Sequence, residues 1–373
     1  MIHFCKTSIT EVEEEYISQA IRGSVCGDGP FTKRATALLM EKTGLKNIML
    51  TTSCTDALEF AAMLSGIKAG DEVILPSFTF ASTANAFLLR GAIPRFCEVD
   101  PHTMNADPKH IAALICDKTK AIVPIDYAGI PCDIDEINKL AKKHNLVVVE
   151  DAAQAVGSTY KGRPAGSDAD FSCFSFHETK NYVMGEGGAI CIKDPELIKK
   201  AEILREKGTD RSRFFRGEVD KYTWQGIGSS FLPSDVLAAM LFGQLSRFEE
   251  IMNKRMCAWN YFNNGLIDLE EEGKLRRPVV PEYAGHNAHI FYIILNSGAE
   301  RDHLMQFLRE KGVGAVFHYV PLHSASIGLA LGNRPEDLPL TEEYASRLLR
   351  LPLFPDLSES ECEHIVNSVK EFF

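Results

Sequence analysis

The 373-residue sequence lacks an excess of basic residues, a long apolar run and a recognisable secretion signal. Its formal net charge of -11 argues against general nucleic-acid binding, which requires a basic surface. No apolar run approaches the ~20 residues that a transmembrane helix needs. The N-terminal residues turn acidic within the first fifteen positions and contain no apolar signal segment. We therefore expect a soluble, cytoplasmic protein.

Paired-cysteine and dinucleotide-binding motifs are also missing. The ten cysteines are scattered and form no CxxC pair, a spacing that fits neither a zinc site nor a small disulfide scaffold. We expect reduced, buried thiols and no metal site. No G-x-G-x-x-G follows the first expected strand, and the GEGG sequence precedes a strand rather than a helix. The sequence therefore argues against a Rossmann dinucleotide site.

Short apolar segments alternate with segments of helical length over residues 47–192. The expected strands cover residues 47–51, 72–76, 93–99, 120–125, 146–150, 171–176 and 188–192. The expected helices cover residues 55–64, 82–90, 108–115 and 134–144. This alternation predicts an α/β fold, in which helices cover both faces of a mainly parallel sheet.

The second half of the chain departs from this pattern. Residues 205–224 are rich in charges of both signs, which predicts an exposed, ordered excursion. A long helix is expected over residues 234–262, followed by a further strand-and-helix region. Because the chain is too long for one core of ordinary size, we expect a large domain, 1–249, and a small C-terminal domain, 250–373.

Two titratable side chains follow neighbouring strands, where ligands of such sheets bind. Asp151 comes directly after the run 146–150, and a buried carboxylate there needs a cation or a strong donor. A protonated pyridine nitrogen is such a partner, although helix N-capping is the commoner role. Lys180 follows the next strand and could act as nucleophile and base once desolvated, or be an ordinary loop lysine. Their combination favours a site for pyridoxal 5'-phosphate (PLP).

A phosphate site is expected where the first strand meets its helix. Ser53, Cys54 and Thr55 stand at that junction, where hydroxyls and free N–H groups of a helix N-terminus can bind an anion. Ordinary N-capping is the alternative, and both roles can coexist. Ser175 could add a hydroxyl from the strand before Lys180. Phe80 could stack on a pyridine ring, although an aromatic after a strand more often packs in the core.

Together these stretches resemble the sugar aminotransferases of the DegT/DnrJ/EryC1/StrS family. The resemblance is carried by residues 70–100, 147–162, 171–190 and 350–359. It implies an aspartate-aminotransferase-like fold (PLP fold type I), with a mainly parallel sheet in the large domain and a smaller α+β domain. It also implies the following roles: a Schiff base between Lys180 and PLP, pairing of Asp151 with the pyridine nitrogen, contact of Phe80 and Gln154 with the ring, and approach of Cys54, Thr55 and Ser175 to the phosphate.

A closer resemblance is to family members that aminate dTDP-4-dehydro-6-deoxyglucose. It is carried by residues 26–34, 175–182, 205–224 and 316–323. It implies L-glutamate as the amino donor and a homodimer with shared active sites. The substrate-binding candidates, each equally compatible with a surface or packing role, are Lys221, Tyr222, His318 and Tyr319. One departure is that Ser230 and Leu232 replace residues that, in many members, reach the partner's cofactor phosphate.

Three other functions are compatible with parts of the sequence. A 3-keto-sugar aminotransferase would share every cofactor residue. A non-catalytic, PLP-binding regulatory protein would bind the cofactor without reacting with glutamate. A PLP-dependent sugar dehydratase usually has histidine in place of the Schiff-base lysine, so the retained Lys180 argues against it.

Overall fold

The protein is built around a seven-stranded sheet. The computed structural model describes residues 1–373. The strand order is β1-β9-β8-β5-β4-β2-β3. The strands are β1 (Ile48–Thr51), β2 (Glu72–Pro76), β3 (Ile93–Cys97), β4 (Thr119–Ile122), β5 (Val147–Asp151), β8 (Phe171–Ser175) and β9 (Gly188–Ile192). All seven expected strands are present, although β3 and β4 end earlier than expected.

The sheet is mainly parallel, as the sequence predicted. Strands β8, β5, β4, β2 and β3 pair in parallel, whereas β9 pairs antiparallel with both β8 and β1. The connection from β8 to β9 contains no helix, so the chain returns beside β8 instead of crossing over. This connection holds Lys180, which places it at the same sheet edge as the end of β5.

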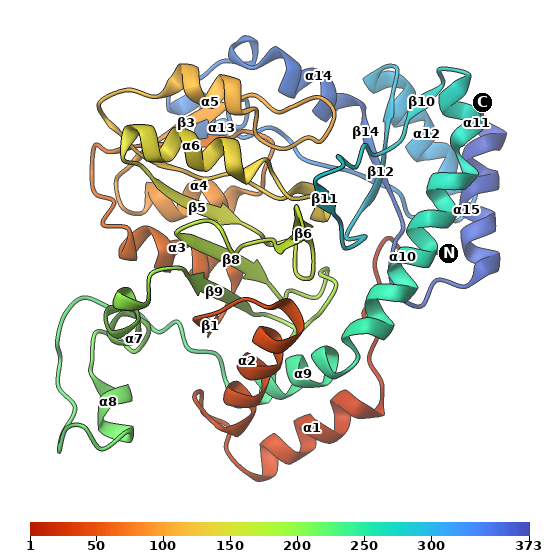
Figure 1. The fold of residues 1–373 in the computed structure, drawn as a ribbon. Helices are drawn as coiled ribbons and strands as arrows, with labels where there is room; N and C mark the ends of the chain where they lie inside the picture. The colour runs from red at the N-terminus through yellow and green to blue at the C-terminus, as the bar shows by residue number, and fades with distance from the viewer.

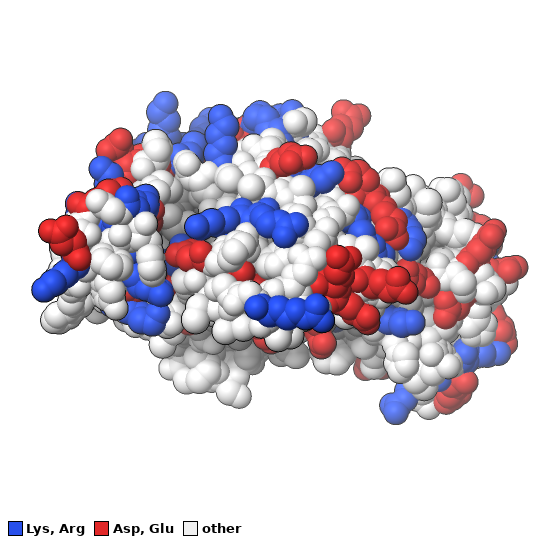
Figure 2. Space-filling view, turned by 90° about the horizontal axis from the view of Figure 1, so that it is seen from below, with Lys and Arg blue, Asp and Glu red and all other residues white.

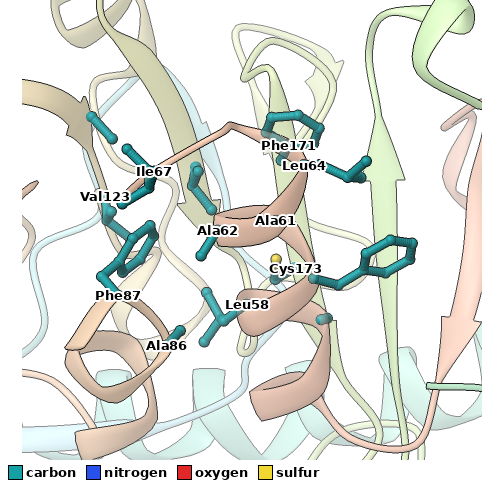
Figure 3. Packing of buried hydrophobic residues seen from close by; sticks show 14 of the residues in the cluster. Leu58, Ala61, Ala62, Leu64, Ile67, Ala86, Phe87, Val123, Phe171 and Cys173 are labelled. Carbon is teal, nitrogen blue, oxygen red and sulfur yellow. The ribbon is translucent and has the colours of Figure 1, made fainter. Parts of the chain in front are cut away.

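Helices cover both faces of the sheet (Figure 1). Val73 and Leu75 pack into the cluster formed with α3 (Cys54–Leu64) and α4 (Ala81–Leu88), whereas Ile74 packs with α5 (Pro108–Leu114) and α6 (Ile134–His144). This alternation is the two-sided burial expected of a parallel strand. Figure 3 shows Leu58 and Ala61 of α3 beside the sheet residue Cys173. The helix predicted over 134–144 has those bounds in the structure.

The helix predicted over residues 234–262 is two helices, α9 (Asp235–Ser246) and α10 (Phe248–Gly265). Arg247 leaves helical geometry (φ -107°, ψ 23°), and its guanidinium binds Glu13 and Glu250. The break lets the two helices pack on different partners. Helix α9 contacts α1 (Glu11–Arg22) and α2 (Pro30–Thr43), whereas α10 contacts α15 (Glu359–Phe372). Periodicity alone could not place this break.

The C-terminal region contains an antiparallel sheet of order β10-β12-β14-β13. Its strands are β10 (Leu275–Arg276), β12 (Phe291–Leu295), β13 (Val316–Phe317) and β14 (Leu348–Leu351). Its helices, besides α10 and α15, are α11 (Ile267–Glu271), α12 (Gly298–Glu310), α13 (Ser326–Ala330) and α14 (Pro339–Arg347). A separate hydrophobic cluster fills this region and includes Ile2 from the N-terminus. A domain division at residues 249 and 250 stays a prediction.

Smaller elements complete the fold. A three-stranded sheet joins the two regions in the order β11-β6-β7. Its strands are β6 (Thr159–Tyr160), β7 (Arg163–Pro164) and β11 (Ala284–Gly285), and single 3-10 turns cover Tyr127–Gly129, Pro195–Leu197 and Pro335–Asp337. None of the helices combines the length and apolar composition that a bilayer-spanning helix needs.

The charged excursion follows α7 (Ile198–Arg205), contains α8 (Arg211–Phe215) and projects from the main body (Figure 1). Ion pairs order it, including Arg205 with Asp28 at 2.8 Å and Arg211 with Glu206 at 2.9 Å. It is mostly exposed, as expected, and Trp224 is 80% exposed, but Arg205 and Glu206 are buried. Figure 2 shows basic and acidic side chains interspersed over one face of the molecule rather than gathered by sign.

The cysteines are all unpaired, as expected. Five of the ten are buried, so the expectation of buried thiols holds for half of them. The exposed cysteines are Cys26, Cys116 and Cys257.

Candidate active site

A cavity of about 810 Å³ lies at the carboxyl ends of the central strands and is closed on its far side by the C-terminal region. This is the place at which parallel α/β sheets bind their ligands. The structure brings nine of the predicted site residues to its wall: Cys54, Thr55, Phe80, Asp151, Gln154, Ser175, Lys180, His318 and Tyr319. Lys221 and Tyr222 lie on the excursion and do not line the cavity of their own chain.

Asp151 ends β5 as a buried carboxylate with two donors. The Thr83 hydroxyl donates to Oδ2 at 2.7 Å, and the Ala153 amide donates to Oδ1 at 3.2 Å. Burial raises the pKa of Asp151, while the two hydrogen bonds and the charge of Lys180 oppose that rise. No helix follows β5, so the alternative role as a helix N-cap is wrong. A cationic ligand group would stabilise the ionised form further.

Lys180 lies half-buried in the turn after β8. Its amide donates to the carbonyl oxygen of His177 at 2.9 Å, which closes this turn. Burial lowers the pKa of Lys180, and the positive charge of Arg350 lowers it further, although Asp151 opposes both effects. Its ammonium therefore loses a proton more readily than that of a solvated lysine. Such an amine can act as a nucleophile and as a base.

The N-terminus of α3 forms an anion cradle. Ser53 is the N-cap, and its hydroxyl accepts from the Asp56 amide at 2.9 Å. The amides of Cys54 and Thr55 at the start of the helix have no acceptor within the chain. Gly188 of β9 packs so closely that an added Cβ would lie 2.5 Å from the Cys54 nitrogen. The expected N-capping therefore coexists with free donors that suit a phosphate.

Two further side chains, Phe80 and Gln154, line the cavity. Phe80 precedes α4 and is 63% exposed, so the alternative that it packs in the core is wrong. Gln154 accepts from the Ala128 amide at 2.7 Å and donates to the Tyr319 hydroxyl at 3.2 Å. These two hydrogen bonds hold the Gln154 amide in one orientation.

His318 lies next to Tyr319 in the wall contributed by the C-terminal region. The Tyr127 hydroxyl lies 3.2 Å from its Nδ1. Burial lowers the pKa of His318 well below its usual range, and the charges of Arg350 and Lys180 lower it further. The ring is therefore neutral at neutral pH, with one nitrogen that donates a hydrogen bond and one that accepts.

Sequence reasoning did not select four residues that shape this site. Thr83 of α4 donates a hydrogen bond to Asp151. His289, Glu186 and Arg350 line the cavity. For Arg350 a signal was available, because it is the one charged residue in the otherwise apolar strand LLRL. Nothing in the local sequence distinguishes the other three.

The residues of the cavity fit pyridoxal phosphate. Asp151 is a buried carboxylate that lacks a cation, the start of α3 has free amide donors, and Phe80 presents an exposed ring. Lys180 supplies an amine of lowered pKa in the same space. These features match the pyridinium, phosphate, ring face and carbonyl of that cofactor.

Comparison with known proteins supports the same identification. The chain matches the DegT/DnrJ/EryC1/StrS aminotransferase family over residues 7–370. A pleiotropic regulatory protein from Geobacillus stearothermophilus is 32% identical, over 96% of this chain and 93% of the relative. The structure of the aminotransferase TlmJ from Streptoalloteichus hindustanus is 32% identical and superposes with a TM-score of 0.91, over 100% of this chain and 98% of the other.

A third similar protein has been solved in cofactor-bound forms. The sugar aminotransferase candidate Spr1654 from Streptococcus pneumoniae, in its PMP form, is 27% identical with a TM-score of 0.93, over 100% of this chain and 99% of the other. Its PLP form superposes with a TM-score of 0.92. The predicted fold type I architecture and the predicted pyridoxal phosphate cofactor are thus confirmed. This chain belongs to the DegT/DnrJ/EryC1/StrS aminotransferase family.

Proposed function

We propose that this protein transfers the amino group of L-glutamate to C4 of dTDP-4-dehydro-6-deoxy-D-glucose. The products are dTDP-4-amino-4,6-dideoxy-D-galactose and 2-oxoglutarate. This is the reaction of the dTDP-4-amino-4,6-dideoxygalactose transaminase of enterobacterial common antigen synthesis, a lipopolysaccharide-related pathway. The observation that carries the proposal is the meeting of Lys180 and Asp151 in one cavity, with the charge of each affecting the pKa of the other.

The chain's own residues supply the proton transfers and the electrostatics. When bound, pyridoxal phosphate supplies the carbonyl that accepts amines and the ring that accepts electrons. Asp151 would pair with the ring nitrogen and favour its protonated form, because Thr83 and Ala153 donate hydrogen bonds that favour the ionised carboxylate. In the glutamate half-reaction Lys180 would take the α-proton and pass it to the bound cofactor. In the sugar half-reaction it would take that proton back and give it to the sugar carbon. One residue would thus act first as base and then as acid in each half-reaction.

The sugar substrate is inferred from the stretches that resemble the C4 aminotransferases. Two of them, residues 175–182 and 316–323, contribute Lys180, His318 and Tyr319 to the cavity wall. A third, residues 205–224, carries Lys221 and Tyr222 on the exposed excursion. We propose that the protein is a homodimer and that this excursion reaches the partner's cavity, where these two side chains contact the nucleotide sugar.

Two alternatives have specific support. A 3-keto-sugar aminotransferase would use the same cofactor residues, because they touch the ring and not the sugar carbon. A regulatory role is suggested by the name of the Geobacillus stearothermophilus relative. Both roles would retain Lys180 for attachment of the cofactor, so reaction with glutamate is what separates them.

Incubation of the purified holoenzyme with L-glutamate and a panel of dTDP-keto-sugars tests the proposal. We expect 2-oxoglutarate to form and NMR to show an axial amine at C4 of the 6-deoxy sugar. An amine at C3 would instead identify the 3-keto-sugar aminotransferase. Cofactor absorbance that does not change with glutamate would identify the regulatory protein.

A further inference from the structure

His289 lies close to Lys180, where the C-terminal region meets the large sheet. It precedes β12 in the chain and is only 7% exposed. Both residues line the main cavity, and both also line a small adjoining pocket. Among the charged groups around His289, Lys180 has the largest effect on the pKa of the imidazole. The imidazole is therefore a close neighbour of the amine that the proposed reaction uses.

A hydrogen-bonded asparagine fixes the proton of this ring. Nδ2 of Asn181 donates to the Asn287 carbonyl oxygen at 2.8 Å, so the other end of the same amide, Oδ1, lies 2.9 Å from Nδ1 of His289. An amide oxygen can only accept, so Nδ1 must carry the proton. The His289 amide donates in turn to Oδ1 of Asn287 at 3.1 Å, which holds the backbone of the histidine. The ring thus has its N–H at Nδ1.

The second ring nitrogen, Nε2, is a free acceptor. Burial lowers the pKa of His289 well below its usual range, and the charges of Lys180, Arg255, Arg350 and His318 lower it further. The ring is therefore neutral at neutral pH, and its one proton is the one on Nδ1. Nε2 forms no hydrogen bond within the chain, yet it is not sealed from the cavity. It therefore presents a lone pair to the space that it shares with Lys180.

The other polar side chains that line both spaces with Lys180 are already engaged. They are Gln154 and Ser175. The Gln154 carbonyl oxygen accepts from the Ala128 amide at 2.7 Å, and the Ser175 hydroxyl accepts from the His177 amide at 3.3 Å. The imidazole nitrogen is thus the acceptor in this group that has no partner.

We propose that Nε2 of His289 accepts a hydrogen bond from the Lys180 amine whenever that amine is free of the cofactor, an inference that rests on the role of Lys180 in the proposed function. A neutral amine has two N–H groups and one lone pair. An acceptor beside it engages an N–H and leaves the lone pair to take the α-proton, whereas a donor would occupy the lone pair. Once Lys180 is an ammonium, the same hydrogen bond is charge-assisted and stronger. His289 is therefore a positioning residue for the base.

Two substitutions separate the two nitrogens of the ring. His289→Asn places an amide near the position of Nδ1, so it keeps the donor to Asn181 and removes the acceptor in the cavity. His289→Gln reaches the position of Nε2 with its amide oxygen, so it keeps the acceptor and loses that donor. The control is His303→Asn, at an exposed position on α12. The glutamate half-reaction is followed by the absorbance of the bound cofactor, with α-protonated and with α-deuterated L-glutamate.

We expect His289→Asn to lower the rate at saturating glutamate about tenfold or more, the effect of losing one hydrogen bond to a charged group. The isotope effect should increase, because proton transfer by Lys180 becomes slower relative to the other steps. The KM for glutamate and the affinity for pyridoxal phosphate should change little. His289→Gln should keep most of the rate, and the control should match the wild type.

Nitrogen-15 NMR of the histidine-labelled apoprotein tests the same inference without any reaction. The chemical shifts of the two ring nitrogens report which of them carries the proton, and His289→Gln identifies the signals. We expect a neutral His289 with its proton on Nδ1 at neutral pH. A proton on Nε2 would overturn the inference, because that nitrogen could then only donate to Lys180.

Three kinetic results would also overturn it. The first is an unchanged rate and isotope effect in His289→Asn, which would show that His289 only packs. The second is an equal loss in His289→Gln, and the third is a loss confined to the half-reaction with the dTDP-keto-sugar, which would make His289 a sugar ligand. A wild type that does not react with glutamate would instead refute the proposed function, and the inference with it.

Discussion

The hydroxyl of Thr83 donates a 2.7 Å hydrogen bond to Oδ2 of Asp151, joining α4 to the end of β5. Thr83 is itself within 2.9 Å of the Thr79 hydroxyl. This bond partly offsets the effect of burial, which raises the pKa of the Asp151 carboxylate. The ionised state of Asp151, on which the cofactor's ring nitrogen depends, is thus set partly by a residue that lies 68 positions away in the chain.

Replacing Thr83 tests this relationship through pH dependence. In Thr83→Val the ionised carboxylate loses a donor, so the pKa of Asp151 should rise and the acidic limb of the rate profile should move to higher pH. A hydrogen bond to a charged group contributes about 1.5 kcal/mol or more, equivalent to about one pKa unit. Thr83→Ser keeps the donor and serves as the control. An unchanged acidic limb in Thr83→Val would show that Thr83 only packs.

Lys180→Ala should abolish turnover and alter the visible absorbance of the bound cofactor. General acid-base catalysis contributes about 10²–10⁴-fold, and covalent attachment is lost as well, so the rate should fall by at least about 10³-fold. Absorbance spectra and single-turnover assays with glutamate measure both effects. Lys161→Ala removes an exposed lysine that pairs with Asp135 and should leave both unchanged. Normal transamination by Lys180→Ala would refute the proposed function.

Gly188→Ala should weaken cofactor binding by disturbing the anion cradle. The new Cβ would lie 2.5 Å from the Cys54 nitrogen and from Ser53 backbone atoms, so the start of α3 must shift. Overpacking of this kind costs about 1–3 kcal/mol, and we expect cofactor affinity to fall by about tenfold or more. Equilibrium titration of the apoprotein with pyridoxal phosphate measures it. Gly226→Ala is the control, because no atom lies within 4 Å of its added Cβ.

A buried acidic pair beneath the site should make stability depend on pH. Oxygen and sulfur atoms of Asp126, Cys132 and Glu150 lie within 4.8 Å of one another, away from solvent. Burial raises the pKa of Asp126 to about 6 and raises that of Glu150 well above its usual range. A raised pKa means that the folded state binds the proton more tightly than the unfolded state does. The stabilisation that comes from this tighter proton binding is therefore complete below about pH 4, and it is lost as the pH rises through about 6 and beyond.

Urea unfolding between pH 5 and pH 8 measures this effect. The free energy of unfolding of the wild type should fall over this range by an amount on the order of 2 kcal/mol. Asp126→Asn, which cannot ionise, should show a smaller fall, whereas the exposed-site control Asp117→Asn should follow the wild type. Parallel pH profiles for the wild type and Asp126→Asn would contradict the assignment.

Local sequence was sufficient to predict the strands that position the candidate catalytic residues. Most strands of the large sheet are mainly apolar runs, and such runs can be read directly from the sequence. The positions of Asp151 and Lys180 at strand ends follow from those runs, because parallel strands bring their carboxyl ends to one edge. The break at Arg247 could not be predicted, since it depends on Glu13 from a distant helix.

What the sequence by itself determined is the α/β pattern, the strand-end placement of Lys180 and Asp151, and, through its motifs, the family and cofactor. Only the tertiary structure decided which groups act on those two residues. Thr83 reaches Asp151, and Arg350 reaches the cavity, from segments remote in the chain, and their effects on the pKa values of Asp151 and Lys180 depend on distance and burial. Electrostatic interactions fall off with separation in space and not with separation in sequence, so no local pattern could reveal them.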